Sequence, residues 1–331
     1  MFRVRPSAAL LVLFATFSAG GCQQPRQASN DRVFVSNEGS NFVSIVDGAT
    51  GRIEGHLATG ARPRGMALSS DRRTLLIAAS DSNRIEAWDS HSLKRTRLLP
   101  SGSDPERFAV SLDGKTLAIA NEDHAAVSFF DLAGGKITRE VKVGPEPEGV
   151  AFSPDGRLVV ATSELASLAH FIDVASGKVL DSVPVGTRPR YVLFLDGGRR
   201  VWVSSEQRGT ISVFDSATRK LVRTIDLADS FDIDEPVQAV EMVATKGQRR
   251  VFVAMGRSNR VAEIDPVTFK VVRSFPTGFR TWGVGLSPDD KRLYAASGLD
   301  GTLTIIDLER NRVARKVELG GKPWGAIAVP R

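Results

Sequence analysis

The sequence predicts an all-β protein, a seven-bladed β-propeller with four-stranded antiparallel blades. Three observations support this prediction. An aspartate that ends a short apolar strand recurs seven times at nearly constant spacing. Alternating strands lie between Gly, Pro and Asp turns, and the repeated region shows no helical periodicity. The repeated region also begins and ends with an incomplete unit, so its two ends can complete one blade together.

The N-terminal stretch has the pattern of an export signal. Arg3 and Arg5 precede an apolar run over residues 8–17, and small residues over 18–21 precede Cys22, the single cysteine of the chain. This placement resembles a bacterial lipoprotein cleavage site, with Cys22 as the lipid attachment residue. The alternative is cleavage nearby by an ordinary signal peptidase, which would leave a free thiol.

The chain therefore divides into three predicted parts. Residues 1–21 are a lipoprotein signal peptide, residues 22–30 are a polar, flexible tether, and residues 31–331 form the propeller. The predicted location is periplasmic, lipid-anchored to the membrane, and we expect the outer membrane to hold the anchor. We expect a monomer.

The repeat is clearest from Gly144 to Asp173, which reads GPEPEGVAFSPDGRLVVATSELASLAHFID. Its closing aspartate has seven equivalents, which are Asp47, Asp89, Asp131, Asp173, Asp215, Asp265 and Asp307. They are 42 residues apart except for one interval of 50. A fixed period of this length indicates a repeat architecture, and radial packing of such units buries both faces of each sheet. We interpret the aspartates as turn residues that accept hydrogen bonds from their own backbone.

The two ends of the repeat are complementary. Residues 31–36 read as the second strand of a blade, because no Gly-x-x-Pro strand precedes them. Residues 323–330 read as an inner strand with no partner after it. The C-terminal strand is therefore expected to complete the N-terminal blade, which removes free sheet edges. Trp88 and Trp202 fall in core slots of the repeat and are expected to be buried.

Several strands and turns carry a family resemblance. The second strands read VFVSN from Val33, LIAAS from Leu76 and AIANE from Ala118, and the inner strands include DPERFAV from Asp104 and KPWG from Lys322. With the Gly-x-x-Pro and Ser-Pro-Asp-Gly turns, residues 31–331 resemble the YVTN family of β-propeller repeat proteins. They resemble more narrowly the propellers associated with PQQ-dependent alcohol catabolism. That association implies an accessory role; no PQQ-binding motif is present and no cofactor is expected.

Charge and composition exclude some functions. The chain of 331 residues has 44 basic and 38 acidic residues, and removal of the signal peptide would leave a net charge of +4. The charges are interspersed, so we expect no nucleic-acid partner. The one long interval of the repeat, residues 227–236, contains an acidic segment whose spacing does not fit an EF-hand loop. It reads as a solvated loop, with contact to a cation or a partner as the alternative.

The candidate binding face combines two kinds of loop. The loop that enters each inner strand and the loop between the second and third strands are expected on the face where the channel opens. The first loop contributes the residue after its proline: Arg64, Glu106, Glu148, Arg190, Val237, Trp282 and Trp324. The second contributes Glu38, Glu122, Glu164 and Glu206. Charged and indole side chains on rigid loops are typical of binding surfaces; the alternative is a solvated rim.

Catalytic groups are scarce. The four histidines, His56, His91, His124 and His170, are spread over strands and opposite faces, so a three-histidine metal site is not expected. The sequence offers no cysteine nucleophile within the propeller, and we assign neither catalytic residues nor a metal. The leading hypothesis is a non-catalytic exported lipoprotein that binds a periplasmic protein or a small ligand at the channel mouth, accessory to a PQQ-linked alcohol oxidation or transport system. A metal-assisted, lactonase-like hydrolase that uses mouth carboxylates is the alternative, and a surface adhesin is a third hypothesis.

Overall fold

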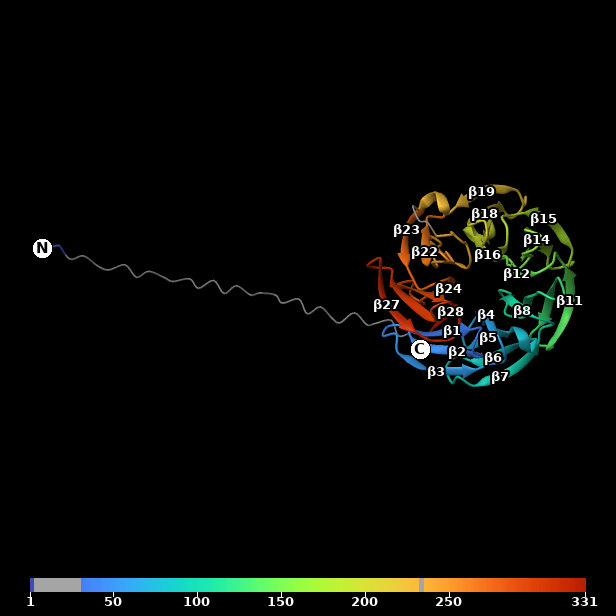
Figure 1. Cartoon of the computed structure of the whole chain (residues 1–331), viewed down its shortest axis with the longest axis horizontal. Coiled ribbons are helices and arrows are strands. Elements are labelled where there is room, and N and C mark those ends of the chain that lie inside the picture. Colours follow the sequence, from blue (N-terminus) through green and yellow to red (C-terminus); the bar gives the residue numbers. More distant parts are fainter. Residues whose placement is uncertain (3–30, 232–234) are drawn as a thin grey trace.

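The computed structural model describes residues 1–2, 31–231 and 235–331. These residues form seven four-stranded antiparallel sheets arranged as blades around a central axis (Figure 1). The predicted fold class, a seven-bladed β-propeller, is confirmed. Cys22, the 22–30 tether and most of the predicted signal peptide lie outside the described residues. No helix within those described residues is both long and apolar enough to cross a membrane.

The blades follow the chain in order, and each is given from its inner to its outer strand. Blade 1 contains β28 (Pro323–Pro330), β1 (Asp31–Asn37), β2 (Phe42–Asp47) and β3 (Ile53–Ala58). Blade 2 contains β4 (Pro63–Leu68), β5 (Thr74–Ala79), β6 (Arg84–Asp89) and β7 (Arg95–Pro100). Blade 3 contains β8 (Pro105–Val110), β9 (Thr116–Asn121), β10 (Ala126–Asp131) and β11 (Lys136–Lys142). Blade 4 contains β12 (Pro147–Phe152), β13 (Leu158–Ser163), β14 (Leu168–Asp173) and β15 (Val179–Pro184).

The remaining three blades complete the ring. Blade 5 contains β16 (Pro189–Leu195), β17 (Arg200–Ser205), β18 (Thr210–Asp215) and β19 (Leu221–Asp226). Blade 6 contains β20 (Met242–Ala244), β21 (Val251–Ala254), β22 (Arg260–Ile264) and β23 (Val271–Pro276). Blade 7 contains β24 (Thr281–Leu286), β25 (Arg292–Ser297), β26 (Thr302–Asp307) and β27 (Arg312–Glu318). Single 3₁₀ turns are η1 (Ser80–Ser82), η2 (Asp196–Gly198) and η3 (Ala228–Ser230).

The ring closes as the sequence predicts. Strand β28 pairs antiparallel with β1, with Val33 opposite Ala328 and Val35 opposite Ala326. Figure 1 shows the first and last strands side by side, with the inner strand supplied by the end of the chain. Closure leaves no inner strand of the described ring without a neighbour in its blade, which limits edge-to-edge association.

The closing aspartates are turn residues, as expected. The Asp47 carboxylate accepts backbone N–H groups of Ala49 and Thr50 at 3.1 and 2.7 Å, and Gly51 follows with a φ of 72°. These hydrogen bonds favour the ionised form, so together with Arg331 they lower the pKa of Asp47 although burial opposes the shift. The aspartates therefore shape hairpins and do not form a carboxylate array.

Apolar side chains fill the space between blades. Trp202 is buried beside Val213, Val251 and Ile264, which belong to blades 5 and 6. Trp88 is buried as well, packed with residues of blades 1 and 2. The predicted core positions of both indoles are confirmed.

Blade 6 has a different register from the one expected. In blade 4, Ala151 pairs with Val160, and in blade 6 Val243 pairs with Phe252, which occupies the same slot as Val160. Val240 lies three residues before Val243, as Glu148 lies three residues before Ala151, so Val240 occupies in blade 6 the position that Glu148 has in blade 4. The assignment of Val237 to this position was wrong. The insertion therefore extends past residue 236. Ala239 occupies the position that is proline in five of the other blades and Thr281 in blade 7.

Candidate functional site

Two sets of loops lie on one face of the ring, which we call the mouth face. Backbone hydrogen bonds join them: Ser80 N–H to Arg62 O at 3.1 Å, and Glu164 N–H to Glu146 O at 2.9 Å. The opposite face, called the turn face, carries the Ser-Pro-Asp-Gly and closing-aspartate turns. The predicted binding residues do converge on the mouth face, yet most of their side chains are paired with each other and several are buried.

Arg190 is the centre of the first cluster, between blades 4 and 5. Its guanidinium donates to Glu148 at 2.7 Å and to Glu206 at 2.6 Å, and it also pairs with Glu164. All four side chains are buried. The alternative of a solvated rim does not describe these glutamates, because both blades bring their residues inward onto the same cation.

Burial and ion pairing compete in setting the charge of this cluster. Burial would raise the pKa of Glu148, but the charges of Arg190 and Arg64 lower it overall. Burial raises the pKa of Glu164, and Arg190 offsets only part of that shift. The pKa of Arg190 is raised by its carboxylate partners in spite of burial. Arg190 therefore favours the ionised form of Glu148, whereas Glu164 is protonated more readily than an exposed glutamate.

Arg188 and Trp282 extend this cluster toward blade 7. Arg188 Nε donates to Glu164 at 2.8 Å, and Gln238 Nε2 donates to Glu206 at 3.2 Å. The Trp282 ring lies 5.3 Å from the Arg190 guanidinium and 4.4 Å from that of Arg280. Cation–π contacts of this kind orient the arginines over the indole.

The second cluster joins blades 1, 2 and 3. Arg64 Nε donates to Glu38 at 3.0 Å and also pairs with Glu106, which is fully buried. Arg62 lies 3.1 Å from Asp104 and 3.2 Å from Glu106. Arg62 and Asp104 were not among the predicted binding residues, although each directly precedes the proline of its loop, next to the predicted position.

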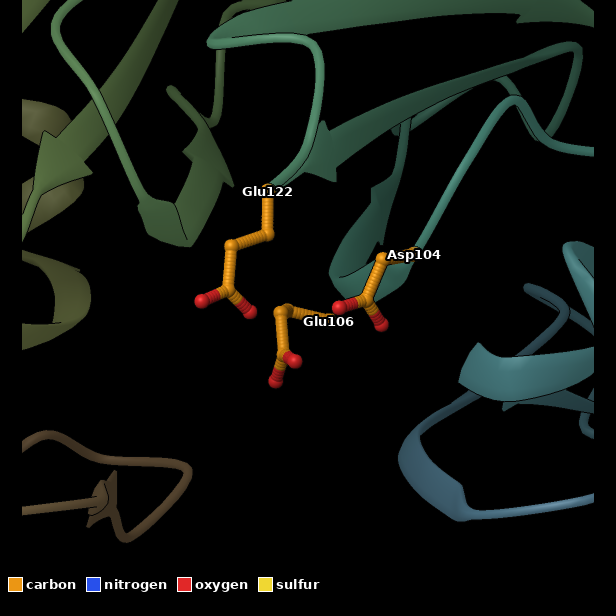
Figure 2. A group of neighbouring side chains, drawn as sticks. All are labelled: Asp104, Glu106 and Glu122. Atoms are coloured by element: carbon orange, nitrogen blue, oxygen red, sulfur yellow. The ribbon is translucent and has the colours of Figure 1, made fainter.

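Asp104, Glu106 and Glu122 form a carboxylate group (Figure 2). One oxygen of each lies within 4.8 Å of the others. Burial raises the pKa of Glu122, the neighbouring Glu148 and Asp104 add to this shift, and Arg64 opposes it only in part. Oxygen ligands in such an arrangement suit a hard cation, but Arg62 and Arg64 already neutralise part of the group.

A third cluster closes the channel along the axis. Arg107 of β8 donates to Glu241 at 3.1 Å, across the ring from blade 3 to blade 6. The Arg107 guanidinium lies 4.8 Å from the Tyr191 ring and 4.1 Å from the Trp324 ring. Trp324, a candidate binding-face residue, is only 4% exposed, so its indole packs inside the channel and is not at the surface.

A position of the repeat that is glycine in most blades could have predicted this axial cluster. Arg107, Tyr191 and Glu241 occupy the second position after the proline or its equivalent. The other four blades have glycine in this position: Gly65, Gly149, Gly283 and Gly325. Glycine there permits close approach of neighbouring inner strands, as at Gly65, where a Cβ would lie 2.8 Å from Glu106 O. Three large side chains in a glycine slot indicate a filled channel.

One part of the mouth face combines exposed apolar side chains with arginines that have few carboxylate partners among the described residues. We call it the Phe279 patch, and it consists of Phe279, Leu299, Arg280 and Arg257. Phe279 is 62% exposed and Leu299 is 66% exposed, and Leu299 N–H donates to Phe279 O at 3.1 Å. Burial lowers the pKa of Arg280, and nearby Arg257 adds to this shift while Glu206 opposes it. The Arg280 Nε is buried with no acceptor among the described residues.

Comparison with known proteins supports the fold. A scan against protein-family models and a search of curated proteins found no match. The structure is similar to the periplasmic gluconolactonase PpgL of Pseudomonas aeruginosa, with 22% identity, a TM-score of 0.75, and coverage of 90% of this chain and 99% of that chain. It is also similar to a functionally unknown protein of Desulfotomaculum acetoxidans, with 15% identity, a TM-score of 0.73, and coverage of 88% and 97%. Hydrazine synthase of Kuenenia stuttgartiensis gives 19% identity, a TM-score of 0.71, and coverage of 80% and 88%.

These similarities define the class of the molecule. At identities this low they show the fold alone, and a propeller supports many unrelated activities. The chain is a seven-bladed β-propeller whose mouth face is built from paired arginines and carboxylates.

Proposed function

We propose that this chain is a non-catalytic, exported binding scaffold whose mouth face holds a protein partner. The Phe279 patch is the observation that carries the proposal. It places two largely exposed apolar side chains beside two arginines, on loops fixed by the blades. Aromatic and arginine side chains supply much of the binding energy at protein interfaces.

The electrostatics of the face indicate what such a partner contributes. The buried carboxylates around Arg190 are already paired, so they shape the surface and are not free to act as an acid and a base. Among the described residues, Arg280 has one carboxylate within ion-pair distance, Glu206 at 3.9 Å. An acidic side chain flanked by apolar residues therefore fits the Phe279 patch best, because it adds a second carboxylate beside the arginines.

The cellular setting completes the proposal. The signal pattern and Cys22 support export and lipid anchoring in the periplasm, and PpgL is a periplasmic protein with a similar fold. The resemblance to YVTN repeat propellers linked to PQQ-dependent alcohol catabolism favours an accessory role in alcohol oxidation or transport. Asp31, the first residue of β1, lies on the turn face, where its carbonyl accepts the Gly48 N–H at 2.9 Å, so an N-terminal membrane tether would leave the mouth face free for a partner.

Site-specific photo-cross-linking in the native host tests the proposal. A benzophenone amino acid replaces Phe279 in one variant and Val267, which is 82% exposed on the turn face, in the matched control. We expect a discrete protein adduct from position 279 and none from position 267. Adducts from position 267 alone, or from neither position, would contradict the proposal.

The carboxylate group of Asp104, Glu106 and Glu122 favours a second candidate, a metal-assisted hydrolase. Three oxygens within 4.8 Å match a cation site in arrangement, and the similar fold of PpgL belongs to a gluconolactonase. Calcium titration followed by calorimetry distinguishes the two candidates. Saturable binding that is lost in Glu122→Gln, together with lactone hydrolysis, would favour the hydrolase over the scaffold.

A further inference from the structure

The central channel contains a cavity that is separate from the mouth face. It has a volume of about 330 Å³. Its rim includes Arg72, Ser287 and Asp290, which belong to turns of the turn face. The cavity therefore opens on the face opposite the Phe279 patch, and the axial cluster forms its floor.

The floor of the cavity consists of buried polar side chains that are held in place by hydrogen bonds. Arg107 is 8% exposed, and its Nη1 donates to Glu241 at 3.1 Å, while its buried Nε has no acceptor among the described residues. Glu241 also accepts the Val284 N–H at 3.3 Å. Tyr191 lines the same cavity, and burial raises the pKa of its hydroxyl, which therefore remains a hydrogen-bond donor at neutral pH.

Lys246 also belongs to the rim, and the walls between the rim and this floor are largely apolar. They come from the inner strands of blades 1, 2, 6 and 7 and consist largely of Met66, Leu68, Val243, Val284, Leu286, Ala326 and Ile327. Apolar walls with a few fixed polar groups are typical of small-molecule sites, and a volume near 300 Å³ lies at the lower end of their range.

The charge on the floor restricts the ligand. Arg107 and Glu241 neutralise each other, so an added charge next to them would be buried without a partner, which is costly. A neutral oxygen, in contrast, can accept from the Tyr191 hydroxyl or from a free N–H of Arg107. We propose that the channel cavity binds a small uncharged molecule with an apolar body and a carbonyl or hydroxyl oxygen directed at Arg107 and Tyr191.

Acetophenone is a suitable probe, because it joins an apolar ring to one carbonyl. Its binding to the purified propeller, measured by calorimetry, is compared with ethylbenzene, which lacks the oxygen, and with benzoate, which is charged. We expect acetophenone to bind most tightly. Tyr191→Phe should weaken acetophenone binding about three- to tenfold, as expected for the loss of one hydrogen bond, and leave ethylbenzene unchanged.

A substitution that fills the cavity tests whether acetophenone binds there. Ala244→Phe adds a ring at the cavity wall and should abolish binding, whereas Ala217→Phe, on an exposed turn, should not. Transfer of magnetisation from the Met66 methyl group to acetophenone, measured on the unmodified protein, tests the same position without a substitution. Absence of that transfer, equal affinity for ethylbenzene, or tighter binding of benzoate would overturn the inference.

Discussion

At the scale of single residues, the environment decides what a polar side chain can do. His170 lies within β14, and only 4% of it is exposed. Its Nε2 accepts the Gly144 N–H at 3.1 Å and lies 2.9 Å from the Ser163 hydroxyl, while Nδ1 lies 2.8 Å from Ser182 Oγ. These bonds define a neutral imidazole that ties strands β13, β14 and β15 to the loop that precedes β12.

This histidine predicts a pH dependence of stability. Burial lowers its pKa in the folded protein below the usual value of 6.5, so the unfolded chain binds a proton first as the pH falls. The free energy of unfolding should therefore decrease as the pH drops from above 6.5 to the folded-state pKa, and this contribution should level off below it. Denaturant titrations at several pH values should show the decrease in the unmodified protein.

The control is a second histidine in a different setting. His170→Gln should reduce the pH dependence, whereas His91→Gln, on an exposed turn, should retain it. An equal pH dependence in His170→Gln and the unmodified protein would show that another group is responsible.

At the scale of elements, closure of the ring depends on how closely inner strands approach. Strand β24 runs against β28, and a Cβ at Gly285 would collide with the Ala326 carbonyl oxygen. That oxygen belongs to the backbone of the strand that completes blade 1, so it cannot rotate away. Glycine in β24 is thus a condition for bringing the last strand into blade 1.

Gly285→Ala should lower the free energy of unfolding by about 1–3 kcal/mol, the usual cost of overpacking. Gly247→Ala is the matched control, because the nearest atom to its new Cβ is Arg249 Cγ at 3.9 Å. Chemical denaturation of both variants measures the difference. Equal stabilities would mean that β24 and β28 adjust freely, contrary to the close contact described.

The elements also show why the fold was predictable and the pairing of charges was not. Turn residues repeat along the chain because each blade needs the same backbone geometry, so Asp47 and its equivalents mark the blades locally. Arg107 and Glu241 are 134 residues apart and meet only because seven inner strands converge on one axis. Val237 was misplaced because it follows Pro236, whereas the residue in the proline position of the loop into blade 6 is Ala239. Burial of Glu148 and Glu206 likewise follows from convergence on Arg190, which no local pattern reports.

At the scale of the whole molecule, the two faces have different properties. The mouth face combines paired charges with the exposed Phe279 patch, and the turn face surrounds the open end of the channel cavity. The proposed protein-binding surface and the proposed small-molecule site therefore lie at opposite ends of one ring.

The tether itself leads to a prediction about location. Cys22→Ala should release the protein from the membrane fraction into the soluble periplasm, because the predicted lipid would be absent. Fractionation with a high-salt wash, followed by immunoblotting, measures the change. Retention of Cys22→Ala in washed membranes would contradict the lipoprotein prediction.

The affinity of the cross-linked partner for the isolated propeller tests the central claim most directly. Arg280→Glu and Phe279→Ala should each weaken binding about tenfold or more, as expected of interface anchors, and the effect of Arg280→Glu should diminish at high salt. Val267→Ala on the turn face should bind like the unmodified protein, and melting curves should coincide for all three variants. Unchanged affinity in both mouth-face variants, with a loss in Val267→Ala, would contradict the assignment of the mouth face as the binding surface.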